Sequence, residues 1–126
     1  ISGKERGVPT ICFRSSGMIA LSRIAVEHLG LYDAKKKVFK NVDIRCGVTF
    51  GKTEFFISAI DGEFSVRKGW HGGALFNNCM LARHVIDKSW SGGAGVVKPD
   101  RMSFRIAIVP VDDDENKDVY ALIKKK

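Results

Sequence analysis

Apolar and polar residues alternate with a period of two between residues 41 and 68, which is typical of half-buried β-strands. We expect three strands in this stretch, over residues 42–50, 54–60 and 63–67. Tight turns at Gly51-Lys52 and Asp61-Gly62 would join them, the second because glycine tolerates a positive φ. The pattern therefore predicts an antiparallel meander over residues 42–67, with one face toward a core and the other presented outward.

Two segments have the 3.6-residue apolar period of an amphipathic helix. The first follows Ser22, a preferred N-cap residue, and ends at Gly30. The second is expected to begin with Asn77 as its N-cap and with Phe76 packing onto Leu81. Loops are predicted for the remaining polar or glycine-rich segments, residues 33–40, 68–74 and 91–95.

Three more strands are predicted outside the meander, over residues 10–13, 101–110 and 118–124. The last two flank the acidic segment 112–116, which we expect to be a solvated hairpin tip. The elements then follow the order β-α-β-β-β-α-β-β. Because strands joined by tight turns pair antiparallel, we predict an α+β fold in which an antiparallel sheet of about five to six strands packs with two helices.

The 126 residues, 44% of them hydrophobic and 28% charged, fit a single domain that buries a core without disulfides or metals. We expect residues 1–9 to be flexible and residues 124–126 to form a basic tail. No apolar run approaches the ~20 residues needed to cross a bilayer, so no membrane partner is expected. Cys12, Cys46 and Cys79 lack CxxC spacing and lie in apolar contexts, which predicts reduced core thiols in a cytoplasmic protein.

Patterns of catalytic chemistry are weak in this sequence. Cys79 and His84 stand five positions apart on a predicted helix and therefore point to different faces, which disfavours a Cys–His nucleophile. The histidines lack metal-ligand spacing, and the acidic segment 112–116 lacks the ligand order of an EF-hand. The glycine-rich segment 91–95 is not followed by a helix carrying Lys and Ser/Thr, as a phosphate-binding loop would be. We therefore expect no enzymatic activity, no metal and no cofactor.

The net charge of +7 favours anionic partners, nucleic acid above all. Arg45 and Arg105 alternate outward on their predicted strands, and Arg67 lies at the end of the meander. Cations spread over a sheet face can bind phosphates, and aromatic side chains among them can stack on bases. The predicted interface comprises Lys35, Lys36, Lys37, Lys40, Arg45, Phe56, Arg67, Lys68, Trp70, Arg105 and Tyr120.

These features favour a non-enzymatic nucleic-acid-binding protein, directed to single strands or of low sequence specificity. The alternative is a protein–protein interaction or assembly module that forms a homo-oligomer. In that case Phe56 or Tyr120 would pack under a helix or at the interface between copies. The two hypotheses differ in whether the basic sheet face is open to a ligand.

Two segments carry a resemblance. Residues 17–31, Gly-Met-Ile-Ala-Leu-Ser through Leu-Gly-Leu, are similar to the opening of small uncharacterised proteins of gut Bacteroides and their phages. Residues 62–67 followed by residues 73–82 are similar to a later pattern of the same proteins, although their Leu-x-x-Gly-Asp-x-Val continuation is replaced here at residues 31–38. The resemblance implies a phage-related protein in which a short strand leads to a helix and then a sheet, with no activity to carry over. At the level of the fold alone, the architecture is similar to single-stranded-DNA-binding coactivator and Whirly folds.

Overall fold

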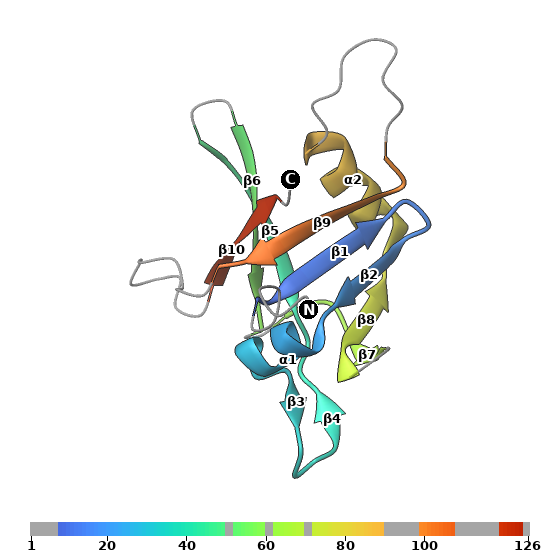
Figure 1. The fold of residues 1–126 in the computed structure, drawn as a ribbon, viewed down its shortest axis with the longest axis vertical. Coiled ribbons are helices and arrows are strands. Elements are labelled where there is room, and N and C mark those ends of the chain that lie inside the picture. Colours follow the sequence, from blue (N-terminus) through green and yellow to red (C-terminus); the bar gives the residue numbers. More distant parts are fainter. Residues whose placement is uncertain are drawn as a thin grey trace, which may run out of the picture.

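The computed structural model describes residues 8–49, 52–59, 62–69, 72–89, 99–107 and 119–124. Eight strands of the described part form one antiparallel sheet in the order β5-β6-β10-β9-β1-β2-β8-β7 (Figure 1). They are β1 (Thr10–Arg14), β2 (Met18–Leu21), β5 (Asp43–Thr49), β6 (Lys52–Ser58), β7 (Arg67–Lys68), β8 (Ala74–Asn77), β9 (Arg101–Ile106) and β10 (Val119–Lys124). A separate hairpin is made of β3 (Tyr32–Asp33) and β4 (Val38–Phe39), and the helices are α1 (Arg23–Leu29) and α2 (Cys79–Ser89).

Strand β10 connects two parts of the sheet. Its residues 119–121 pair with β6, whereas its residues 122–124 pair with β9. β10 therefore pairs with one group of strands along its first half and with another group along its second half, and the sheet curls (Figure 1). We call β5 and β6 the hairpin limb, and β9, β1, β2, β8 and β7 the long limb.

A closing segment, residues 62–69, links the two outer edges of the curled sheet. Phe64 and Val42, which directly precedes β5, exchange two backbone hydrogen bonds of 2.8 and 2.9 Å. A few residues later the same segment becomes β7 and pairs with β8. Gly62 permits this path because a Cβ there would overlap the backbone of Val42. The Phe64 ring also stacks on that of Phe76 in β8, with centroids 5.4 Å apart, so the closing segment joins the limbs into a ring of strands.

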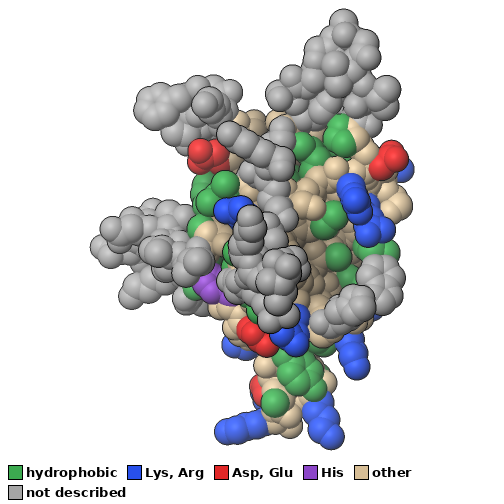
Figure 2. Space-filling view, viewed as in Figure 1, with side chains coloured by type: hydrophobic (Ala, Val, Ile, Leu, Met, Phe, Trp, Pro, Cys, Tyr) green, Lys and Arg blue, Asp and Glu red, His purple; other side chains and the backbone are tan. Residues whose placement is uncertain are grey.

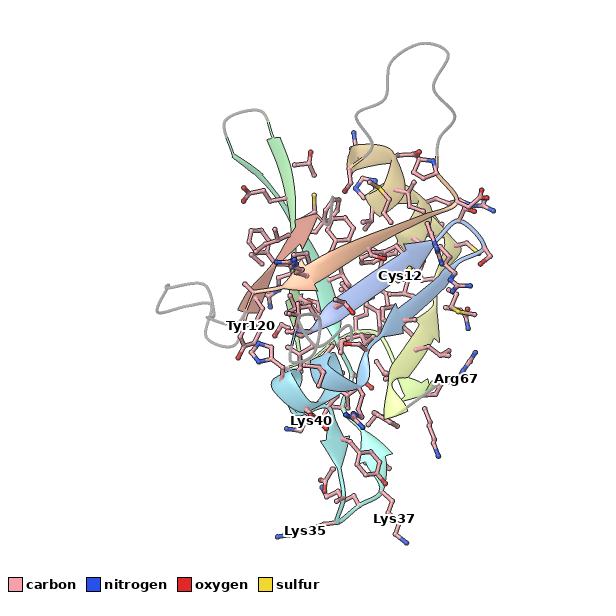
Figure 3. The ribbon with its side chains drawn as sticks, in the orientation of Figure 1. Cys12, Lys35, Lys37, Lys40, Arg67 and Tyr120 are labelled. Atoms are coloured by element: carbon pink, nitrogen blue, oxygen red, sulfur yellow. The ribbon has the colours of Figure 1, made fainter. Side chains whose placement is uncertain are left out.

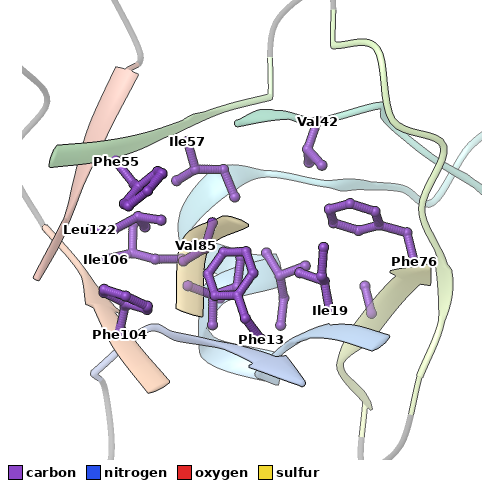
Figure 4. Close-up of a cluster of buried hydrophobic side chains, with 14 of the residues drawn as sticks. Phe13, Ile19, Val42, Phe55, Ile57, Phe76, Val85, Phe104, Ile106 and Leu122 are labelled. Carbon is purple, nitrogen blue, oxygen red and sulfur yellow. The ribbon is translucent and has the colours of Figure 1, made fainter. Parts of the chain in front are cut away.

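The core lies inside this ring and is shared by both limbs and both helices (Figure 4). Phe13 and Phe104 of the long limb meet edge to face with centroids 5.6 Å apart, and Phe55 of the hairpin limb is 3% exposed. Each such side chain contributes about 1.5–3 kcal/mol on burial. The helices add Ala25, Val26, Ala82, Val85 and Ile86 to the same cluster. Since both helices pack on the inner side, no helix covers the outer sheet face within the described ranges.

The predicted strand number and order are wrong. The hairpin of the meander is present as β5–β6, but residues 63–67 do not form its third strand. They bridge to the residue before β5 and then pair with β8, on the opposite edge of the sheet. Residues 18–21 and 74–77, which had no predicted strand, form β2 and β8 and pair with each other. Strands this short are specified by their partners, because four residues carry too little periodicity.

The helix boundaries test the predicted caps. Ser22 is confirmed as the N-cap of α1, where its Oγ accepts a first-turn backbone hydrogen bond of 3.1 Å, and Gly30 ends the helix at φ +61°. The second prediction is wrong by one residue, because the Oδ1 of Asn78 accepts the first-turn hydrogen bond of α2, at 3.0 Å. Asn77 is instead the last residue of β8, and Phe76 lies in the same strand, where its ring stacks on that of Phe64.

The cysteines are not core thiols, contrary to the prediction. Cys46 and Cys79 are exposed, Cys12 is half-buried on the outer face of β1, and all three are free. Other predictions lie wholly or partly outside the described residues: residues 1–7 of the lead-in predicted to be flexible over residues 1–9, the acidic segment 112–116 and residues 125–126 of the basic tail. Pro9, at the end of the predicted lead-in, is fully buried, and its carbonyl oxygen accepts a hydrogen bond from the backbone N–H of Ile106. Among the helices of the described part, none is long and apolar enough to span a bilayer.

Candidate nucleic-acid interface

Three of the predicted lysines, Lys35, Lys36 and Lys37, lie on a projecting arm, the β3–β4 hairpin of residues 32–39 (Figure 3). The segment was expected to be a loop, but Asp33 organises its turn by accepting hydrogen bonds from the backbone N–H groups of Lys35 and Lys36, at 3.0 and 3.2 Å. Lys37 follows with φ +56°, and Lys40 lies just after β4. All four lysine side chains are exposed, and Lys35 and Lys37 form a cationic tip, whereas Lys40 lies at the base of the arm beside α1 (Figure 3).

Arg45 and Phe56 lie opposite each other on the outer face of the hairpin limb. The Nε of Arg45 lies 3.4 Å from the Oδ2 of Asp43 on the same strand. Glu54, opposite Gly47, adds a second carboxylate to this face. The charge of Arg45 is therefore balanced by neighbouring acids.

Tyr120 does not share a face with Phe56. It lies opposite Ile57, which is fully buried, and its ring meets that of His28 in α1 with centroids 4.7 Å apart. The Nε2 of His28 also lies 3.1 Å from the backbone oxygen of Ala107. Tyr120 thus packs between the sheet and α1, and cannot form a stacking platform together with Phe56.

The outer face of the long limb carries four arginines, two of which sequence reasoning had not selected. Arg105 and Arg67 were predicted, and Arg14 and Arg101 join them, because all four share the outward parity of their strands. Figure 2 shows basic side chains on this side near the β1–β2 turn and, separately, at the tip of the arm. A neutral row crosses the middle of the face, made of Ser103, Cys12, Ala20 and Leu75.

Arg14 and Arg101 are directly opposite each other across β1 and β9. Directly opposite residues have Cα atoms about 5 Å apart, and like charges in this position are destabilising. The five strands of the long limb contain no Asp or Glu, and no ion pair joins these arginines to an acid within the described part of the chain. Asp100, just before β9, is exposed. Among the residues that the structure describes, this face therefore carries positive charge without a paired acid.

Arg67 and Lys68 are neighbours on β7 but point to opposite sides of the sheet. Arg67 lies opposite Leu75 on the outer face, whereas Lys68 lies opposite Ala74 and lines a cleft beside α1 and the arm. Trp70, predicted as a stacking residue, lies outside the described residues. The predicted interface is thus divided among the arm, the hairpin limb, the long limb and this cleft.

The arrangement of nucleophilic side chains does not form a catalytic pair in the described part. The Sγ of Cys79 donates a hydrogen bond to the backbone oxygen of Ser16 at 3.3 Å. The ring of His84 packs edge-on against Phe55 instead, with centroids 6.0 Å apart. Within the described part of the chain, no group of three or more His, Cys, Asp or Glu side chains comes together to hold a metal ion. His71 lies outside the described residues.

No protein-family model, curated protein or solved structure matches this chain. The resemblance to small proteins of gut Bacteroides and their phages therefore stays a prediction, as does the similarity to coactivator and Whirly folds.

Proposed function

We propose that this protein binds nucleic acid through the outer face of its long limb, mainly by contacts to the phosphate backbone. The observation that carries the proposal is the directly opposed pair Arg14 and Arg101, in a set of strands without a carboxylate. A bound phosphate between two guanidinium groups would replace their repulsion by two charge-assisted hydrogen-bonding contacts.

The spacing of the arginines suits an extended polyanion. Arg105 on β9 and Arg67 on β7 lie at the two ends of the long limb, separated by four strand-to-strand steps of about 4.8 Å each. That distance, about 19 Å, corresponds to about five or six phosphates at 3.4 Å per nucleotide. In the neutral row between the arginines, Ser103, Cys12 and Ala20 have small, partly exposed side chains that let a sugar–phosphate chain approach the sheet over β9, β1 and β2, whereas Leu75 on β8 is only 6% exposed.

Low sequence specificity follows from the chemistry of these contacts. Arginine binds phosphate bidentately through its planar guanidinium, and phosphate contacts carry no base sequence. Of the aromatic residues predicted to stack on bases, Phe56 lies on the other limb and Tyr120 on the inner side of the sheet. The described outer face of the long limb therefore favours backbone binding over base recognition.

The proposal can be tested by fluorescence anisotropy with labelled single strands and duplexes of about 20 nucleotides, between about 50 and 300 mM salt. The double variant R14Q/R101Q is expected to lower affinity at least about tenfold and to reduce the slope of log K against log salt by about 1.5 to 2. The matched control is R45Q/K88Q, which removes the same charge from the hairpin limb and α2. Its affinity should change about twofold or less.

Three results would contradict the proposal. One is an absence of binding at the lowest salt, and another is an equal loss in both double variants, which would mean that only net charge matters. The third is a change in molar mass by light scattering in R14Q/R101Q alone, which would make this face an interface between copies of the chain, as the assembly hypothesis expects. Thermal unfolding of each variant checks that its fold is intact.

A further inference from the structure

A cleft of about 400 Å³ opens between α1, the β3–β4 arm and the start of β8. This volume lies within the range of about 300–1,000 Å³ that is common for small-molecule sites. Its apolar walls come from Val26, Tyr32 and Phe39, and its polar rim is formed by Arg23, Lys68 and Glu27. The cleft thus combines aromatic surface with two cations from separate elements and one carboxylate.

The aromatic wall is a cross-strand pair at the base of the arm. Tyr32 and Phe39 are directly opposite each other, with ring centroids 5.0 Å apart and planes inclined by 56°. Tyr32 is 47% exposed, although it is a large ring on a small hairpin. An exposed aromatic face beside a cleft is a stacking surface for a flat ring such as a nucleobase.

The cationic rim is shaped by a glycine. Gly72 has φ +80°, and a Cβ there would come within 2.9 Å of the Cδ of Arg23, so the glycine leaves room for the Arg23 side chain. Glu27 lies 3.8 Å from the Nε of Arg23, with both side chains about two-thirds exposed. Exposed pairs of this kind contribute only about 0–1 kcal/mol, so an incoming phosphate can displace the carboxylate.

We infer that this cleft binds one nucleotide, with its base stacked on Tyr32 and Phe39 and its phosphate held by Arg23 and Lys68. That this nucleotide belongs to a bound single strand rests on the proposed function. Arg67 on the outer face and Lys68 in the cleft are neighbours on β7, so a strand that leaves the long limb over this edge arrives at the cleft. A base can enter only when it is unpaired, which gives single strands an advantage over duplexes.

The direct test is an NMR titration of the ¹⁵N-labelled protein with adenosine 5′-monophosphate. Saturable shifts are expected for the backbone amides of the residues that line the cleft, which are Arg23, Val26, Glu27, Tyr32, Phe39, Lys68, Gly72 and Gly73. Tyr32→Ala should weaken binding about tenfold, because stacking on one aromatic ring is lost. Val38→Ala is the matched control, since Val38 is 50% exposed on the same arm and does not line the cleft.

A second pair of measurements separates the base from the phosphate. Arg23→Gln should weaken binding of adenosine 5′-monophosphate several-fold and leave binding of adenosine unchanged, because only the former carries a phosphate. Absence of shifts at the cleft, or equal effects of Tyr32→Ala and Val38→Ala, would overturn the inference. So would a loss of adenosine binding in Arg23→Gln that equals the loss for the nucleotide.

Failure of the cleft and failure of the proposed function can be told apart with an abasic oligonucleotide, which keeps the phosphates and lacks the bases. R14Q/R101Q should weaken the intact and the abasic strand alike, whereas Tyr32→Ala should weaken only the intact strand. Oligonucleotide binding that depends on Arg14 and Arg101 without nucleotide shifts at the cleft would overturn the cleft alone. Nucleotide binding at the cleft without oligonucleotide binding would overturn the proposed function and leave a site for free nucleotides.

Discussion

The two limbs of the sheet have similar inner faces and different outer faces. On the inside, Phe55 of the hairpin limb and Phe13 of the long limb both lie in the core. On the outside, Arg45 of the hairpin limb is paired with Asp43, whereas Arg14 of the long limb faces another arginine, Arg101. Folding requires the inner pattern but gives no reason for a like-charge pair. This difference is the basis for the proposal that the outer face of the long limb binds a polyanion.

Removal of a core ring from either limb is the largest effect that we predict. Phe13→Ala and Phe55→Ala should each lower the free energy of unfolding by about 3–5 kcal/mol, because each leaves a cavity in the shared core. Urea denaturation followed by circular dichroism measures the free energy of unfolding of both variants. Arg105→Gln is the control, and its free energy of unfolding should stay within about 0.5 kcal/mol of that of the parent protein. A loss below about 1 kcal/mol for Phe55→Ala alone would mean that the hairpin limb adds little to the core.

Charge reversal tests the outer faces directly. Arg105→Glu and Arg45→Glu change the net charge equally, yet Arg105→Glu should lower single-strand affinity about tenfold or more at about 100 mM salt. Arg45→Glu should change it only about two- to threefold, because Asp43 already balances that cation. Anisotropy titrations measure the ratio, and a ratio near one would remove the distinction between the limbs.

Smaller effects on stability are expected from substitutions that add or remove a Cβ atom on the outer faces of the two limbs. Gly47→Ala should stabilise the protein by about 0.5–1 kcal/mol, since glycine weakens a strand. An added Cβ would meet Phe56 at an ordinary 3.4 Å. Ala20→Gly in the long limb should have the opposite sign and a similar size. Both midpoints can be read from urea denaturation, and a change in nucleic-acid affinity for Gly47→Ala would contradict the assignment of binding to the long limb.

The smallest effects that we predict are changes in the free energy of unfolding on charge substitution, and they have opposite signs in the two limbs. Arg101→Glu converts the like-charge pair with Arg14 into an attractive one and should stabilise the protein by about 0.2–1 kcal/mol at low salt. Asp43→Asn removes the partner of Arg45 and should destabilise it by a few tenths of a kcal/mol. Both shifts should shrink in about 1 M salt, where surface charges are screened. Destabilisation by Arg101→Glu would show that Arg14 and Arg101 do not repel each other.

Features that depend on neighbours in the sequence were predictable. The alternation over residues 43–58 identified the β5–β6 hairpin, and Ser22 was identified as a cap by its hydroxyl and the apolar period after it. The short strands β2, β7 and β8 were not predictable, because each owes its conformation to a partner strand. The route of residues 62–69 from one sheet edge to the other likewise depends on tertiary contacts.

The candidate site shows the same division. Arg101 and Arg105 lie on the same face of β9, as the alternation of apolar and polar residues over 101–106 already predicts. That Arg14 stands opposite Arg101 depends on the register between β1 and β9, which are far apart in the sequence. Tyr120 was expected to face outward because its neighbours have the other parity, but α1 covers it through His28. The local sequence pattern does not predict which strand a helix packs against.

The position of β10 also has a consequence for synthesis. β10 is the last of the described strands in chain order, yet it lies in the middle of the sheet, between β6 and β9. A chain emerging from the ribosome begins with its N-terminal part, so β6 must wait with an unpaired edge until β10 has been made. Unpaired edges can add strands from other chains. The strand that joins the two limbs thus also sets when the growing chain loses the unpaired edges of β6 and β9.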